Sequence, residues 1–185
     1  MNTEMNVNTL SALRDATLEI ERHVARGGWD GPVRIFALVK AQAALAANPE
    51  LAEELPADVQ VDAITDPNTL FSVEQEDLPH ANTLEELLGS IVWPDSVDGA
   101  ALSVERIVLP PSAEVNLPED EAEALEVLKT HPQREDVRMV VATLRAGETW
   151  SAIRMKSHDE DASVLSAEDL VPGLAAALQQ TFITD

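Results

Sequence analysis

The chain has 185 residues, of which 34 are Asp or Glu and 12 are Lys or Arg, so its formal net charge at pH 7 is −22. This charge repels phosphate, which excludes general electrostatic binding to nucleic acid and disfavours anionic membrane surfaces. The 45% of hydrophobic residues suffice for the core of one soluble domain over residues 1–185, and no apolar run approaches the length of a membrane span.

The N-terminal part is expected to form two paired helices. Apolar residues between Val7 and Arg26 recur at three- and four-residue steps, which predicts an amphipathic helix ending at Gly27-Gly28. Pro32 suits the first position of a second helix, predicted to run to Ala47. The broad apolar face of this second segment predicts that the two helices pack as a hairpin.

The middle of the chain predicts short strands and one short helix. Val59, Val61 and Ile64 fit an edge strand between prolines, and residues 70–75 fit another strand. Thr83 and Glu86 form a capping box, in which each side chain satisfies a backbone amide at a helix start. This predicts a helix to about residue 91.

The C-terminal half predicts a strand, a helix, a hairpin and a last helix. These lie over residues 99–109, 119–130, 137–155 and 172–182, with Gly147 in the turn of the hairpin. The order of elements predicts an α+β fold in which a mainly antiparallel sheet packs against helices on one face. An exposed strand at residues 99–109 would also allow a homodimer.

Common catalytic motifs are missing from the sequence. It contains no Cys, no G-x-S-x-G, no phosphate-binding or dinucleotide-binding glycine loop and no H-E-x-x-H. The run from His158 to Asp161 resembles a cation site but lacks the Gly and the distal Glu of an EF-hand loop, which favours a solvated loop. We therefore predict no catalytic residue, no metal ligand and no cofactor.

The acidic residues are unevenly distributed along the chain. Residues 41–105 contain fourteen Asp or Glu, no Lys or Arg, and only His80 as a potential cation. These carboxylates either face water or are covered by the Arg residues of the two ends. The leading hypothesis is a non-enzymatic acidic binding, adaptor or chaperone-like protein that recognises a basic partner, because such complementarity speeds association and excludes wrong partners.

Five residues are candidates for the binding site. Trp93 can anchor a partner through its large ring, although a packed tryptophan is the commoner case. The other four, Glu74, Glu76, Glu105 and His80, would serve the alternative hypothesis of a small-molecule or metal-dependent enzyme with a site on the sheet face. Their convergence in one concave pocket favours the enzyme, and dispersal on a convex surface favours the adaptor. A DNA mimic, the third hypothesis, predicts carboxylates in two rows.

Several blocks of the sequence carry a family resemblance. These are GGWDGPVRIFALV (27–39), SVEQEDLP (72–79), LEELLGSIVWPDSVDGAALSVERIVLPPSAE (84–114), HPQREDVRMVVATLRAGETWSAIR (131–154) and DLVPGLAAAL (169–178). The sequence resembles a conserved family of actinobacterial proteins of similar length and unknown function. The resemblance implies a cytoplasmic actinobacterial protein and supplies no reaction. The N-terminus, without a cationic segment before an apolar one, also indicates no secretory signal.

Overall fold

The computed structural model describes residues 2–110, 112 and 116–183. Its elements are, in chain order, α1 (Asn2–Ala25), β1 (Arg34–Lys40), α2 (Ala41–Ala47), η1 (Pro49–Glu53), α3 (Ala57–Thr65), β2 (Leu70–Glu74), α4 (Leu84–Gly89), β3 (Gly99–Val108), α6 (Glu121–Thr130), β4 (Glu135–Leu144), β5 (Thr149–Met155), η2 (Lys156–His158), η3 (Asp161–Ser163), β6 (Leu165–Ala167) and α7 (Pro172–Gln180). Within the described residues the strands form one six-stranded sheet in the order β2-β1-β3-β4-β5-β6, and each neighbouring pair is antiparallel. The predicted α+β class is confirmed.

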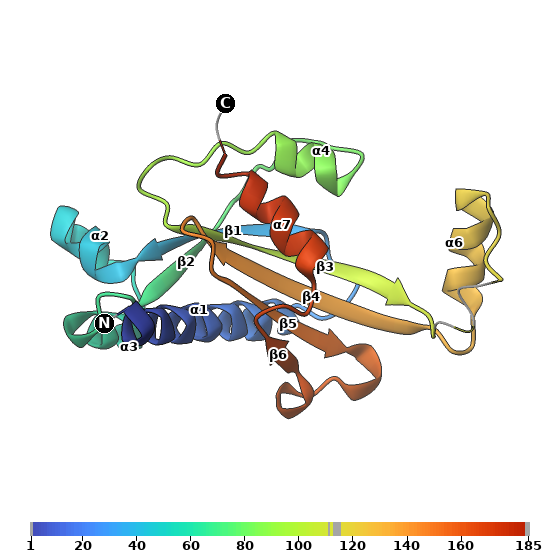
Figure 1. Ribbon diagram of the computed structural model, residues 1–185, viewed down its shortest axis with the longest axis horizontal. Helices are drawn as coiled ribbons and strands as arrows, with labels where there is room; N and C mark the ends of the chain where they lie inside the picture. The colour runs from blue at the N-terminus through green and yellow to red at the C-terminus, as the bar shows by residue number, and fades with distance from the viewer. Residues whose placement is uncertain (1, 111, 113–115, 184–185) are drawn as a thin grey trace.

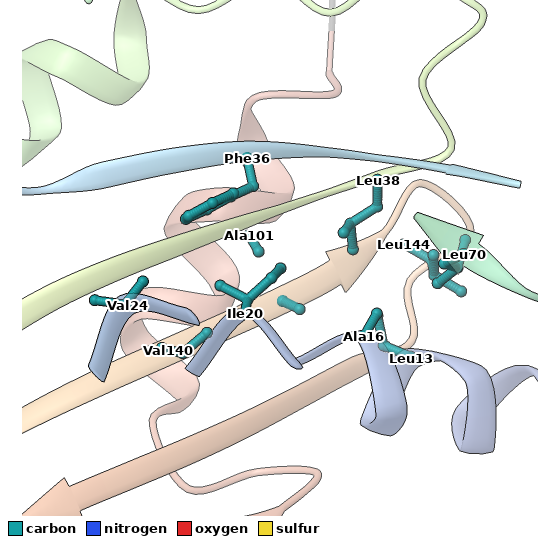
Figure 2. Close-up of a cluster of buried hydrophobic side chains, with 11 residues drawn as sticks. Leu13, Ala16, Ile20, Val24, Phe36, Leu38, Leu70, Ala101, Val140 and Leu144 are labelled. Atoms are coloured by element: carbon teal, nitrogen blue, oxygen red, sulfur yellow. The ribbon is translucent and has the colours of Figure 1, made fainter. Parts of the chain in front are cut away.

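Helix α1 lies along one face of the sheet (Figure 1). Its residues Leu13, Ala16, Ile20 and Val24 recur at three- and four-residue steps, so they form one stripe that packs on the sheet. Figure 2 shows these side chains directed at the sheet residues that complete the cluster, which include Phe36, Leu38, Ala101, Val140 and Leu144. Burying an aliphatic or aromatic side chain of this kind contributes roughly 1.5–3 kcal/mol.

Helices α4 and α7 cover the opposite face of the sheet (Figure 1). Leu87 and Leu88 of α4 and Leu178 of α7 pack there on alternate strand residues such as Ala100 and Leu102. Successive strand side chains point to opposite faces, which is why one strand supplies both clusters. The expectation of helices on a single face is therefore wrong, and the sheet lies between two helical layers.

The predicted helical hairpin is not formed, because residues 34–40 are a strand rather than the start of a helix. β1 is an inner strand between β2 and β3, so Ile35, Phe36, Ala37 and Leu38 are all buried. A run that is apolar on both sides satisfies the helical pattern as well as the pattern of an inner strand. Only the later half of the predicted helix is helical, as α2 from Ala41 to Ala47.

The predicted edge strand around Val59, Val61 and Ile64 is also wrong, since these residues belong to α3. Val59 and Ala63 are its buried residues, four positions apart, as one helical face requires.

The predicted strand at 70–75, the Thr83 helix, the 137–155 hairpin and the C-terminal helix are confirmed within a few residues. The short strand β6 on the far edge was not predicted.

The predicted strand at 99–109 is confirmed as β3, but it is not the exposed strand that we expected. Residues 99–103 pair with β1 on one side and with β4 on the other, so this half is not available to a second copy of the chain.

The Thr83 side chain accepts from the amide of Glu86, as the capping box predicts, while Glu86 accepts from the amide of Asn82 rather than from that of Thr83.

Candidate functional site

The face of the sheet that packs on α1 becomes polar at one end. Arg34 lies opposite Ser103, and Glu105 lies opposite Arg138, which in turn lies opposite Arg154. These residues alternate along their strands with those that point to the other face, so they share the face of Phe36 and Val140. Charged side chains thus follow the apolar cluster along the same four strands, near the C-terminal end of α1.

A cavity of about 760 Å³, here called the sheet-end cavity, opens at this polar end. Its walls are the loop from Gly27 to Arg34 and the segment from Glu74 to Leu84. The four residues predicted for a carboxylate site all line it, namely Glu74, Glu76, His80 and Glu105. Arg34 and Arg138, which sequence reasoning did not single out, line it as well.

Two of the predicted carboxylates already have structural partners. Glu105 accepts hydrogen bonds from the backbone amides of Asp30 (2.9 Å) and Gly31 (2.7 Å), which holds the loop over the sheet. Glu74 forms an ion pair with Arg34, and the hydrogen bond from that guanidinium lowers the pKa of Glu74 below its usual value. A carboxyl with a lowered pKa is ionised at neutral pH, so Glu74 is poorly suited to act as a general acid.

Beneath the loop lies a buried charged network formed by Glu21, Arg138 and Arg154. All three side chains are at most 3% exposed. Arg154 donates to Glu21 from Nε (2.9 Å) and from Nη2 (2.7 Å), while Nη1 of Arg138 lies 4.0 Å from the same carboxylate. The bonds to Glu21 raise the pKa of Arg154 above its usual value. One buried carboxylate therefore faces two buried guanidiniums.

The loop residue Trp29 closes this network from above. The Arg138 guanidinium lies 4.4 Å from the centroid of its ring, and the indole Nε1 donates to Asp159 at 3.0 Å. Asp159 and Asp161 also accept from Arg154, at 3.1 and 2.5 Å. The acidic run 158–161 is exposed, as expected of a solvated loop, and two of its carboxylates also supply counter-charge to a buried arginine.

Side chains that can bind metals or act as nucleophiles are also present in the described part of the chain. Within residues 2–110, 112 and 116–183, no group of three or more His, Asp or Glu side chains is arranged to bind a metal ion. Ser157 Oγ lies 2.9 Å from Nδ1 of His158, but this hydroxyl is exposed and donates to Glu135 at 2.5 Å. Neither Ser157 nor His158 lines the sheet-end cavity.

Trp93 does not join the other four candidates. It is 7% exposed, donates from Nε1 to Thr181 Oγ1 at 2.8 Å, and stacks on Phe182 with 6.0 Å between ring centroids. Trp93 is thus a core residue that forms one wall of a second cavity of about 440 Å³, here called the apolar cavity. Glu76 and Asp77 line both cavities, because the segment 75–79 separates them.

The carboxylates of residues 41–105 mostly face outward. Ten are exposed, namely Glu50, Glu53, Glu54, Asp58, Asp62, Glu76, Asp77, Glu85, Glu86 and Asp95, and we call these ten the acidic surface. The other four, Asp66, Glu74, Asp98 and Glu105, are half-buried. In this segment of the described chain, only Glu74 forms an ion pair with Lys or Arg. The arginines of the two ends therefore do not cover this surface.

Comparison with known proteins shows which family this chain matches. Residues 13–183 match the family described as PPA1309-like protein. The chain belongs to this family. The match spans both helical layers, the sheet and both cavities, and it confirms the resemblance seen in the sequence blocks, whereas the actinobacterial source stays a prediction. Neither the curated proteins nor the solved structures contain a match.

A pH titration should detect the contact between Trp29 and Asp159. The hydrogen bond from Trp29, followed by that from Arg154, lowers the pKa of Asp159. A carboxyl whose pKa is lower in the folded state stabilises the fold above its unfolded pKa, about 4. This stabilisation is lost as pH falls through the folded value. We expect the NMR signal of the Trp29 indole N–H to shift below pH 4.

The same titration of Asp159→Asn should lack this shift, because the amide keeps an acceptor oxygen but does not titrate in this range. Asp169→Asn is a matched control at an exposed carboxylate and should titrate as the native chain does. An identical Trp29 titration in the native chain and in Asp159→Asn would contradict the assignment.

Proposed function

We propose that this protein is a non-catalytic binding protein of the cytoplasm that recognises a basic protein partner through the acidic surface. The observation that carries the proposal is the exposure of these ten carboxylates without Lys or Arg partners in the described chain. The sequence blocks that carry the family resemblance support an actinobacterial source. No described helix is both long and apolar enough to cross a bilayer.

The physical basis of recognition is an uncompensated negative potential. A surface of one sign attracts an oppositely charged partner over about one Debye length, about 8 Å at physiological salt. Such a field accelerates encounter and disfavours acidic competitors more than it strengthens the final complex. The sheet-end cavity adds a concave feature with Glu76 and Asp77 on its wall, into which a cationic side chain of the partner can enter.

The experiment compares two variants that each remove three exposed acids. The test variant carries Glu76→Gln, Asp77→Asn and Glu85→Gln, and the control carries Glu121→Gln, Glu123→Gln and Glu126→Gln on α6. Each purified chain is immobilised and used to capture proteins from native lysate over a series of salt concentrations. The captured protein is then identified and its affinity measured.

We expect a basic partner that elutes as salt rises, that binds the control as it binds the native chain, and that binds the test variant about tenfold more weakly. Three exposed charge contacts at about 0.5 kcal/mol each give this factor. Equal loss in both variants would show that only net charge matters. Co-purification of a metabolite without any protein would reverse the ranking of the hypotheses.

A small-molecule enzyme remains the second candidate because Glu74, Glu76, His80 and Glu105 line one cavity, as this hypothesis required. Its volume of about 760 Å³ suits a small ligand. Glu74 is paired with Arg34, and Glu105 accepts hydrogen bonds from the loop amides. These two carboxylates therefore support binding of a ligand rather than acid–base catalysis.

One further arrangement, which combines two acids of α1 with two acids of the acidic surface, favours a DNA mimic. Asp15 and Glu19 on α1 face Asp58 and Asp62 on α3 across a cavity of about 360 Å³. Residues four apart lie on one helical face, so these acids form two short rows. If the protein is a DNA mimic, duplex DNA will compete with it for the captured basic partner.

A further inference from the structure

The outer edge of the sheet at β2 presents backbone groups that have no partner in the described part of the chain. Among these residues, β2 is the first strand of the sheet and its one neighbouring strand is β1. The amide of Gln75 donates to the carbonyl of Ile35 (2.8 Å), and the amide of Ala41 donates to the carbonyl of Thr69 (2.9 Å). Antiparallel pairs alternate, so the odd-numbered residues of β2 bond to β1. The N–H and C=O groups of Ser72 and Glu74 therefore point outward.

Nothing in the described part of the chain covers these groups. The backbone amides of Ser72 and Glu74 have no hydrogen-bond partner among residues 2–110, 112 and 116–183. Ser72 is exposed, and its neighbour Val73 is 44% exposed. Helix α3 reaches this edge at the start of β2, where Phe71 packs on the cluster of Val59 and Ala63 and Leu70 lines a cavity with α3 residues. Free sheet edges of this kind are templates for pairing with another strand.

The apolar cavity opens beside this edge. It is lined by Val39 of β1 and Val73 of β2, which share the face away from α1, and by Val92, which is 78% exposed. Every second side chain of a strand added beyond β2 would point to this face and reach the cavity. The remaining side chains would lie on the α1 face, where a polar cavity is lined by the acids Glu19 and Glu74 and by the basic residues Arg22, His23 and Arg26. Side chains of the added strand on this face are therefore expected to be neutral, and its cationic residues are expected at the ends of the segment.

We propose that the basic partner binds here by adding an extended segment to β2, with an apolar side chain in the apolar cavity and cationic residues on either side of it. This inference rests on the proposed function. Charge selects this occupant, because Glu76 and Asp77 line the apolar cavity and residues 41–105 contain no Lys or Arg. A second copy of the chain brings a second net charge of −22 to the same edge and is disfavoured.

The test uses a seven-residue peptide, acetyl-Lys-Val-Ser-Leu-Ser-Val-Lys-amide, and a second version with N-methyl groups on its five central residues. In an antiparallel pair the residues that bond to Ser72 and Glu74 lie on the same face as these two residues, so methylating Val and Leu alone would leave those donors in place. N-methylation keeps the side chains and charges but removes the backbone donors. The protein variants are Ser72→Pro and Ser72→Ala. Because the Ser72 amide points away from β1, Pro removes an outward donor without removing a bond to β1, and edge strands tolerate Pro.

We expect the native chain and Ser72→Ala to bind the unmodified peptide equally by calorimetry, with the amides of Ser72 and Glu74 becoming protected from hydrogen exchange. Ser72→Pro and the N-methylated peptide should each weaken binding about tenfold. Circular dichroism establishes that Ser72→Pro is folded, and the N-methylated peptide tests the same backbone contacts on the native chain.

The outcomes separate this inference from the proposed function. If the N-methylated peptide binds the native chain as tightly as the unmodified one, while Glu76→Gln with Asp77→Asn weakens both, strand addition is wrong and the acidic surface still binds basic partners. If protection at Ser72 occurs without peptide and rises with protein concentration, the occupant is a second copy and the inference is overturned. If Glu76→Gln with Asp77→Asn binds the unmodified peptide as tightly as the native chain does, these charges do not contribute to recognition and the proposed function fails.

Discussion

Replacing Glu21 by Gln is expected to lower the free energy of unfolding by about 3 kcal/mol, because it removes one partner of a buried ion pair. Glu21 is 1% exposed and accepts three hydrogen bonds from Arg154. The amide is nearly isosteric, so the loss reports charge and hydrogen bonding rather than a cavity. Arg154 retains Asp159 and Asp161, which places the expected loss at the lower end of the range for buried pairs.

Urea unfolding measures this loss of stability, and two further variants serve as comparisons for Glu21→Gln. Glu19→Gln removes an exposed carboxylate from the same helix and should change the stability by less than about 0.5 kcal/mol. Glu21→Gln combined with Arg154→Met removes both buried charges of the pair, and it should be more stable than Glu21→Gln alone. A loss below 1 kcal/mol for Glu21→Gln would contradict the buried network.

The network also connects stability to the candidate site. Arg138 donates to the carbonyl of Gly28 and stacks on Trp29, so the loop that forms one wall of the sheet-end cavity is attached to the Glu21 network. Glu105 fixes the same loop from β3. Weakening the network is therefore expected to loosen this wall as well as the fold.

The strands and helices that sequence analysis predicted well have one apolar face or a clear boundary residue. Thr83 marks a helix start, and Gly147, with φ of 119°, marks the hairpin turn. The errors occur where tertiary contacts, rather than the local sequence pattern, determine the secondary structure. Residues 34–40 are buried on both faces of an inner strand, and α3 buries only Val59 and Ala63, so neither segment carries a distinctive period.

The candidate site was predictable in part. Glu74, Glu76, His80 and Glu105 do line one cavity, although their grouping rested on residue type alone. The buried network was missed, but its signal was present in the hairpin. Pairing across the 145–148 turn places Arg138 opposite Arg154, and each occupies a position on the apolar face beside Val140 or Ala152. Two charges on the inward face of a hairpin require a buried anion, which distant Glu21 supplies.

Gly99→Ala is expected to lower the free energy of unfolding by about 3 kcal/mol, the upper part of the range for overpacking. A Cβ at this position would lie 2.5 Å from the carbonyl oxygen of Thr143 and 2.9 Å from Cδ2 of Leu144. The backbone cannot easily withdraw, because hydrogen bonds of the adjacent Asp98 to Leu38 and Arg145 hold it on both sides. Gly173→Ala, where a Cβ meets nothing within 4 Å, is the matched control and should not destabilise the helix α7. Urea unfolding of the two variants decides the matter, since equal stabilities would mean that β3 and β4 separate at this point without loss.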